Sequence, residues 1–226
     1  MKFTVAACSL FLLVWNPVRS YSQERMDIDD SFVLELGLPN SFVNGAFKNI
    51  MQGLVYVSPM YQYTLKSGLS FGAGVHYSYF NVNQFRINQD VSGGMHNGAA
   101  FLKLGYEKFW SPSLATDISI KAGLVQSAFT TDTLKKLGYT YQARVSPYFE
   151  PNLGICLASD VNASFRLTLG YAFYGFGFRP ANLGIDSDLG YSTAELNKIS
   201  SFLIVGFGYS RYFNGKKSSN PGWDEE

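Results

Sequence analysis

Apolar and polar side chains alternate along most of the chain with a period of two residues. Between residues 69 and 80, apolar and aromatic side chains occupy every second position, and serine, glycine and histidine lie between them. Successive side chains of a β-strand point to opposite faces, so this pattern predicts a strand with one apolar and one polar face. The same pattern predicts strands of about ten residues in seven further segments: 32–38, 55–65, 100–107, 117–124, 149–157, 164–173 and 203–210.

The connections between these strands alternate in length. Segments 66–68, 111–113 and 159–162 read as tight turns, whereas 39–53, 81–98, 127–146 and 178–198 are long and polar. In bacterial outer-membrane barrels the short turns face the periplasm and the long loops face outward, and an even strand number leaves both chain ends periplasmic. We therefore predict an all-β fold: an eight-stranded antiparallel transmembrane up-and-down β-barrel over residues 31–213, located in the bacterial outer membrane with periplasmic termini.

The apolar face of this barrel is expected to point outward, because an eight-stranded barrel is only just wide enough for its own side chains. Strand glycines on the other face would leave room for long charged side chains and ease curvature. A β-sandwich with a solvated face is the alternative, and it would carry threonine, lysine and glutamate there instead. Aromatic residues near the strand ends predict two interfacial girdles: Tyr61, Tyr63, Tyr106, Phe109, Trp110 and Tyr209 on one side, and Tyr77, Tyr79, Tyr148, Tyr171 and Phe173 on the other.

Composition agrees with a barrel that contacts an apolar medium. Hydrophobic residues make up 46% and charged residues only 15%, against about 25% charged in a typical soluble domain. This composition argues against intrinsic disorder and against a coiled coil. The formal net charge of +1 argues against a nucleic-acid partner, which would call for a basic face.

Residues 1–22 are expected to be a secretory signal peptide. A lysine at position 2 precedes an apolar run from Thr4 to Trp15, and small residues follow at Ser20 and Ser22; the run is too short to span a bilayer as a helix. Cleavage would leave a short N-terminal lead at 23–30, the barrel at 31–213 and a short periplasmic tail at 214–226. It would also leave Cys156 as the single cysteine, which excludes an internal disulfide.

The whole region 31–213 resembles the small eight-stranded outer-membrane barrels of the OmpA-like and OmpX-like class, and its glycine- and tyrosine-rich style resembles the porin-like barrels of Bacteroidota. The last strand resembles the signal that the barrel-insertion machinery reads, a terminal aromatic residue with apolar residues at every second position before it: Val205, Phe207, Tyr209 and Phe213. Arg211 departs from that pattern, and a tail follows Phe213. The resemblance implies the insertion machinery as a partner during assembly, and outer-membrane lipid and lipopolysaccharide as surroundings.

Seven charged residues fall on the polar face that would line the interior: Glu35, Lys103, Glu107, Asp117, Lys121, Glu150 and Arg166. Across the 111–113 turn a direct register would set acid against acid and lysine against lysine, so opposite charges must pair diagonally. Because an unpaired charge in a confined interior is costly, we expect a bonded network. This network either closes the pore or forms the selectivity element of a small channel.

Catalytic signals are sparse. His76 and Ser78 share one strand face and resemble the His-x-Ser pair of outer-membrane lipid A deacylases, but those sites face the lipid whereas this pair would point inward, and Tyr79 stands where the family has asparagine. His96 lies in a glycine-rich segment and is expected to be a loop residue. No cysteine–histidine cluster has metal-ligand spacing, and no glycine pair opens a helix as a phosphate-binding loop would, so neither a metal nor a cofactor is predicted.

The sequence therefore favours a non-enzymatic outer-membrane barrel with a structural role or an accessory role in a larger envelope complex, whose protein partner the sequence does not name. A narrow channel for small solutes is the first alternative. A lipid A-modifying enzyme that uses His76 and Ser78 is the second.

Overall fold

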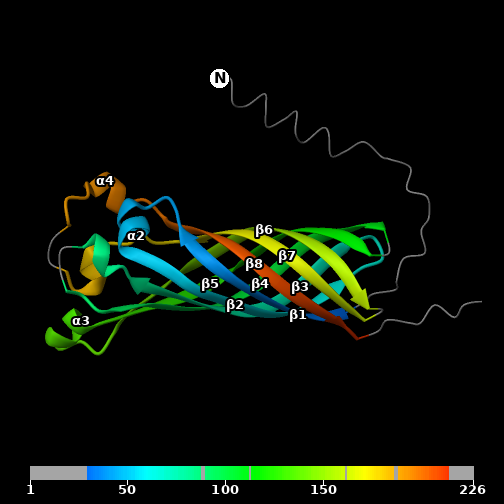
Figure 1. Ribbon diagram of the computed structural model, residues 1–226, viewed down its shortest axis with the longest axis horizontal. Helices are drawn as coiled ribbons and strands as arrows, with labels where there is room; N and C mark the ends of the chain where they lie inside the picture. Colours follow the sequence, from blue (N-terminus) through cyan, green and yellow to red (C-terminus); the bar gives the residue numbers. More distant parts are fainter. Residues whose placement is uncertain (1–29, 88–89, 112, 161, 186–187, 214–226) are drawn as a thin grey trace, which may run out of the picture.

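The protein forms a closed barrel in which eight strands pair antiparallel in chain order and the last strand pairs with the first (Figure 1). The computed structural model describes residues 30–87, 90–111, 113–160, 162–185 and 188–213. The expected signal peptide and tail, and the lead up to residue 29, lie outside these residues. The strands are β1 (Asp30–Ser41), β2 (Met51–Thr64), β3 (Leu69–Val82), β4 (Gly93–Ser111), β5 (Leu114–Thr131), β6 (Gln142–Asp160), β7 (Ala163–Tyr174) and β8 (Ser200–Tyr212).

The alternation seen in the sequence separates the two surfaces of the barrel wall. Leu102 and Leu104 of β4 are 70% and 52% exposed, whereas Lys103 between them is 2% exposed. The same contrast recurs around the barrel, so large apolar side chains cover its outside and polar side chains point inward. We call this outer surface the outer apolar belt; it includes Leu36, Val75, Leu102, Leu104, Ile118, Ile120, Leu124, Leu153, Ile155, Leu167, Leu169, Val205 and Phe207.

The two ends of the barrel differ. The connections β2–β3, β4–β5 and β6–β7 are short and lie at one end, the turn end, while the connections that carry helices lie at the other, the helix end (Figure 1). The start of β1 and the end of β8 both lie at the turn end, where the backbone N–H of Phe213 donates to the carbonyl of Asp30 at 3.1 Å. No helix among the described residues is long and apolar enough to cross a membrane. The helices are α2 (Gly45–Ile50), η1 (Gln84–Arg86), α3 (Asp132–Lys136), η2 (Pro180–Leu183) and α4 (Thr193–Leu196).

The strands are longer than the ten residues that the alternation predicts. β4, β5 and β6 contain 19, 18 and 19 residues, and the β4–β5 ladder continues to the pair Gly93 and Thr131 at the helix end. His96 therefore belongs to β4, and the prediction of a loop residue is wrong. Beyond the belt the outward positions of these strands carry polar or small residues such as His96 and Gly98, while the inward positions still carry apolar residues such as Met95 and Phe129. The ladder therefore continues where the sequence contrast of the belt has ended.

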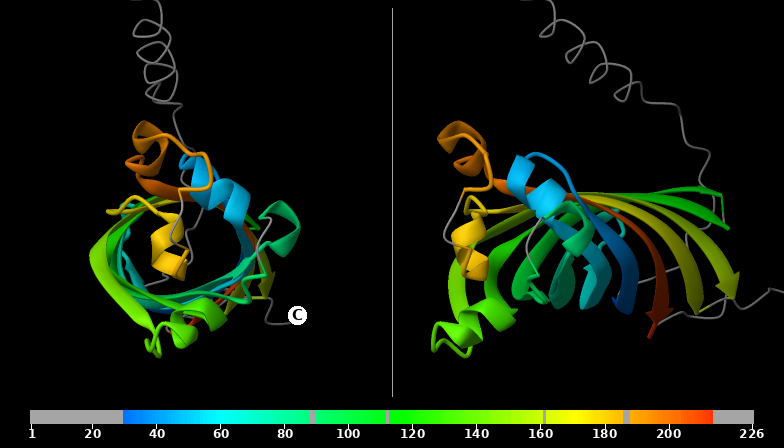
Figure 2. Two further views of the ribbon diagram at one scale, coloured as in Figure 1. Left: turned by 90° about the vertical axis from the view of Figure 1, so that its left-hand side faces the viewer. Right: turned by 60° about the vertical axis from the view of Figure 1, so that its left-hand side comes forward.

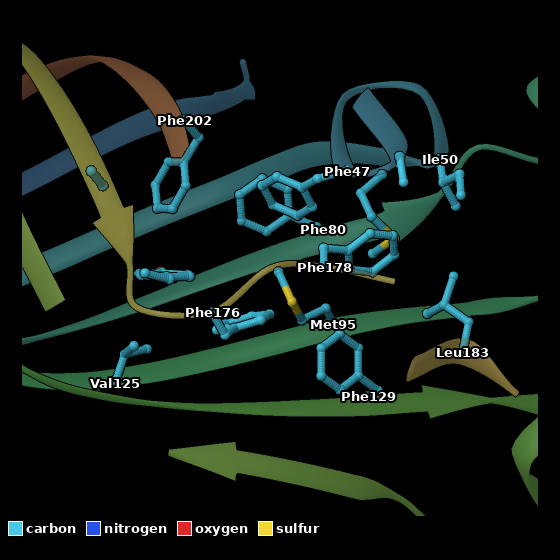
Figure 3. Packing of buried hydrophobic residues seen from close by; sticks show 14 of the residues in the cluster. Phe47, Ile50, Phe80, Met95, Val125, Phe129, Phe176, Phe178, Leu183 and Phe202 are labelled. Atoms are coloured by element: carbon cyan, nitrogen blue, oxygen red, sulfur yellow. The ribbon is translucent and has the colours of Figure 1, made fainter. Parts of the chain in front are cut away.

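The interior is not polar throughout, which corrects the expectation of a polar bore. Its half near the helix end is filled by an apolar plug of Phe47, Ile50, Phe80, Met95, Phe129, Phe176, Phe178, Leu183 and Phe202, drawn with its neighbours in Figure 3. Phe47 packs against Phe80 and Phe178 with ring centroids 5.0 and 5.5 Å apart. Strand residues such as Phe80 supply the wall, while α2 and the β7–β8 connection supply the filling, and η2 lies across the barrel mouth (Figure 2).

Candidate functional site: the barrel interior

All seven charged residues that the sequence places on the polar face are buried inside the barrel, each with at most 2% of its surface exposed. Their side chains come from β1, β4, β5, β6 and β7, and they form two groups on the turn-end side of the apolar plug. The residues are Glu35, Lys103, Glu107, Asp117, Lys121, Glu150 and Arg166.

Lys121 is the centre of the first group. Its ammonium lies 2.6 Å from Oε2 of Glu35 on the other side of the barrel and 3.0 Å from Oε1 of Glu150 on the neighbouring strand. Glu150 uses its second oxygen to accept hydrogen bonds from the hydroxyls of Tyr148 and, at 3.1 Å, Tyr56. A buried charge is costly unless it is paired and hydrogen-bonded, and here one cation satisfies two carboxylates, of which Glu150 is further hydrogen-bonded.

Asp117 is the centre of the second group. It accepts from the ammonium of Lys103 and, at 2.7 Å, from Nη1 of Arg166. Lys103 also donates to Oε1 of Gln62 at 2.6 Å, and Arg166 lies 3.8 Å from Glu107. The chain thus places two cations and two carboxylates together on the turn-end side of the interior.

The register of β4 and β5 explains why the ion pairs are diagonal. Lys103 lies directly opposite Lys121, and Glu107 directly opposite Asp117. Like charges directly opposite each other destabilise a sheet, so the long lysine side chain of β4 reaches along the interior to Asp117. Lys121 turns the other way, toward Glu35 and Glu150.

His76 and Ser78 lie between the ionic network and the apolar plug, and they are linked through a third side chain. The hydroxyl of Tyr174 lies 3.2 Å from Nε2 of His76 and 3.1 Å from Oγ of Ser78. Ser78 also accepts from the amide of Asn97 at 3.1 Å. Tyr174 thus stands where a direct histidine–serine contact would be needed for the histidine to act as a general base.

Several interior residues escaped the sequence reasoning. Tyr148 was expected in an aromatic girdle, but its side chain is buried in the interior and donates to Glu150; this expectation is wrong. The signal that could have placed it is parity, because Phe149 is exposed on the outside and neighbours in a strand point to opposite faces. The same test assigns Tyr174 to the interior, as it does Tyr56, which the alternation along residues 55–65 already places on the polar face.

Two side chains at the helix end join three separate connections. Asn44 caps α2 by accepting from the N–H of Phe47 at 2.9 Å, and its amide nitrogen donates to the carbonyls of Phe178 and Lys198 at 3.3 and 2.8 Å. Thr131 caps α3 in the same way at 3.1 Å from the N–H of Leu134, and its hydroxyl donates to the carbonyl of Leu183 at 2.8 Å. Each cap therefore also fixes the β7–β8 connection that carries the plug.

The residues of the expected assembly signal lie on the outside of the barrel. Val205, Phe207 and Tyr209 of β8 point outward with Phe213, as does Arg211, and the rings of Phe213 and Tyr61 are stacked with centroids 6.4 Å apart. Cys156 is a buried free cysteine. Within the described part of the chain, no group of three or more histidine, cysteine, aspartate or glutamate side chains could hold a metal ion.

No family model matches the sequence, and no curated protein matches it. Among solved structures the barrel is similar to Neisserial surface protein A from Neisseria, with a TM-score of 0.50, 11% identity, and coverage of 81% of this chain and 97% of that one. A major outer membrane protein of Thermus thermophilus is similar with a TM-score of 0.46 and 16% identity, and the match covers 81% of this chain and 99% of that one. Ail of Yersinia pestis is similar with a TM-score of 0.44 and 12% identity, and the match covers 82% of this chain and 99% of that one. At 11% identity, the similarity to the Neisserial protein shows the fold alone.

Proposed function

We propose that this protein is an integral outer-membrane barrel of the small OmpA-like and OmpX-like kind. The outer apolar belt supports this proposal, because soluble monomeric proteins rarely expose contiguous apolar patches larger than a few hundred Å². A closed barrel pairs all the strands that would cross the bilayer and leaves no open sheet edge in lipid. Trp110 at the turn end, with the ammonium of Lys108 4.1 Å from its ring centroid, has the amphipathic character expected at a membrane interface.

The orientation follows from the difference between the two ends. Short turns at one end and helix-bearing connections at the other match the periplasmic and external sides of outer-membrane barrels. Asp30 and Phe213, the first and last described residues, both lie at the turn end, which supports periplasmic termini. The outward-facing residues of β8 support recognition by the barrel-insertion machinery during assembly.

The role that the interior supports best is structural and non-conducting. The single observation that carries this proposal is the presence of two successive layers of buried side chains across the bore, the ionic network and the apolar plug. Lys121 in the first layer and Phe178 in the second each have 0% of their surface exposed. A conducting pore would need polar side chains that line open space and bind solutes weakly.

The interior gives less support to a lipid-modifying enzyme. His76 and Ser78 have 2% and 0% of their surface exposed, and both hydrogen-bond to Tyr174 beneath the plug. A lipid outside the barrel wall cannot approach them while the wall is intact. The helix end, where two capping side chains fix the loops, is a better candidate for contact with an envelope protein, because loops held by a rigid scaffold commonly carry recognition.

The proposal is tested by cell fractionation, gel mobility and conductance measured on one preparation. We expect the protein in the outer-membrane fraction, with a mobility that changes on boiling, and no conductance steps after reconstitution in planar bilayers. Absence of the mobility shift would contradict the membrane barrel. Reproducible conductance steps would contradict the sealed interior and favour the channel.

A further inference from the structure

We propose that a hollow on the outer face of the barrel at the helix end binds a sugar of a membrane glycolipid headgroup. This inference rests on the proposed membrane location and adds a binding site and a ligand class to it. The hollow, which we call the rim hollow, has a volume of about 290 Å³ and is lined by Tyr79, Ser92, Gly93, Gly94, His96, Thr130, Thr131, Asp132 and Lys135.

The rim hollow lies where a lipid headgroup would lie in the proposed orientation. Tyr79 of β3 pairs with His96 of β4, and both side chains are on the outer surface, above the exposed Val75 and Leu124 of the belt. Lys135 of α3 reaches the hollow from the β5–β6 connection. An acyl chain that runs along the belt would therefore place its headgroup between β3, β4 and α3.

Two glycines give the hollow its depth. A Cβ at Gly94 would lie 2.8 Å from the hydroxyl of Tyr79 and 2.3 Å from the carbonyl oxygen of Phe80, and Gly93 has a φ of +128°, which side chains rarely adopt. The ring of Tyr79 can therefore lie against the backbone of β4 and form one wall. Its centroid is 4.7 Å from that of the His96 ring.

The polar groups around the hollow are mixed donors and acceptors. Nδ1 of His96 is occupied by the hydroxyl of Tyr77 at 2.8 Å, so Nε2 is the ring nitrogen left for a ligand. One oxygen of Asp132 accepts from the N–H groups of Ser92 and Thr133, both at 2.9 Å. The ammonium of Lys135 adds a cationic donor to the lining.

This combination favours a sugar over a bare anion. The positive Lys135 and the negative Asp132 offset each other, so the hollow has no strong excess of charge with which to select phosphate. Hydroxyl groups are both donors and acceptors, and they can satisfy an amine, a carboxylate and an imidazole at the same time. Concave sites with an aromatic wall and a few placed polar groups are typical of small-ligand recognition.

The strand surface below the hollow suits the attached acyl chain. On β4 the next outward positions after His96 are Gly98 and Ala100, and a Cβ at Gly98 would meet nothing within 4 Å. Tyr77 of β3 stands beside Gly98 in the register. The outward positions of β4 below the hollow therefore carry little side-chain bulk, which leaves room for an acyl chain beside Tyr77.

The experiment measures lipid retention by native mass spectrometry on the full barrel in detergent micelles. The probes are lipid A, lipid A without its phosphates, and phosphatidylethanolamine with matched acyl chains. We expect both forms of lipid A to be retained at concentrations at least tenfold lower than phosphatidylethanolamine. Equal retention of all three lipids would overturn the site, and a preference lost with the phosphates would overturn the choice of a sugar.

Variants locate the site on the barrel. The double change His96→Ala and Lys135→Ala should weaken lipid A retention at least tenfold, while Lys48→Ala, an exposed lysine of α2 outside the hollow, should leave it unchanged. Equal weakening by both, or by neither, would overturn the location. The mobility shift on boiling is recorded for every sample: its loss in the wild type counts against the proposed membrane barrel, whereas an intact shift without lipid preference counts against the rim hollow alone.

Discussion

Lys121 of β5 and Glu35 of β1 form an ion pair across the barrel interior, with 2.6 Å between Nζ and Oε2. The two residues are 86 positions apart in the chain, and their strands lie on different sides of the barrel. The contact therefore ties the first hairpin to the middle of the chain, and Lys121 extends the link to Glu150 on β6.

Replacement of Lys121 by methionine should strongly destabilise the barrel. The change leaves Glu35 and Glu150 buried without their shared cation, and breaking a buried ion pair typically costs about 3–5 kcal/mol. Urea unfolding of protein refolded into lipid vesicles measures the free energy of unfolding. Lys136→Met is the matched control, because Lys136 is exposed and should change the free energy by no more than about 0.5 kcal/mol. A similar small effect of both changes would contradict the ionic network as a stabilising element.

The outward orientation of Leu104 predicts a second stability change. Leu104→Arg places a charge on the outer apolar belt, where a charged substitution near mid-membrane costs roughly 2–4 kcal/mol. Phe85→Arg introduces the same side chain at a fully exposed residue of η1 and should leave the free energy of unfolding nearly unchanged. Equal sensitivity of the two positions in lipid vesicles would mean that the belt does not face lipid.

Asn44 predicts a local change at the helix end. Asn44→Ala removes the cap of α2 together with the hydrogen bonds to Phe178 and Lys198, and such losses cost about 1–3 kcal/mol. Hydrogen exchange should become faster in the segment from Phe176 to Lys198 while β1–β6 stay protected. Asn49→Ala removes only an exposed hydrogen bond from Arg86 at 3.3 Å and should not alter exchange in the plug. Faster exchange throughout the barrel would show that Asn44 has a global role.

The barrel and the faces of its strands could be predicted because each belt residue alternates with an inward neighbour, as Leu104 does with Lys103. This contrast is local and survives in a single sequence. The diagonal ion pairs were also foreseeable in kind, because the tight turn between β4 and β5 fixes the register and sets Lys103 opposite Lys121. Which carboxylate each lysine reaches depends on the curvature of the closed barrel.

The apolar plug could be predicted only in part. Phe80, Met95, Phe129 and Phe202 have inward parity when the strands are extended toward the helix end, and this parity indicates an apolar layer. Phe178 and Leu183 lie in a connection with no periodic signal. Their burial depends on hydrogen bonds from Asn44 and Thr131, which are distant in the sequence. The contact of Tyr174 with both His76 and Ser78 likewise arises only when β3 and β7 face each other across the closed interior.

The pH dependence of the contact between α3 and the β3–β4 connection follows from Asp132. The N–H of Ser92, with a further contribution from that of Thr133, holds the pKa of this carboxyl below its ordinary value of 3.8. Because the folded state binds a proton less readily than the unfolded state, the carboxylate stabilises this contact above pH 4, and the stabilisation is lost as the pH falls through the lowered pKa.

Hydrogen exchange at the amide of Ser92, corrected for the intrinsic pH dependence of exchange, should therefore lose protection below pH 4 in the wild type. In Asp132→Asn the amide oxygen can still accept but does not titrate, so protection should be weaker and independent of pH over the same range. Equal pH dependence in both proteins would place the titrating group elsewhere.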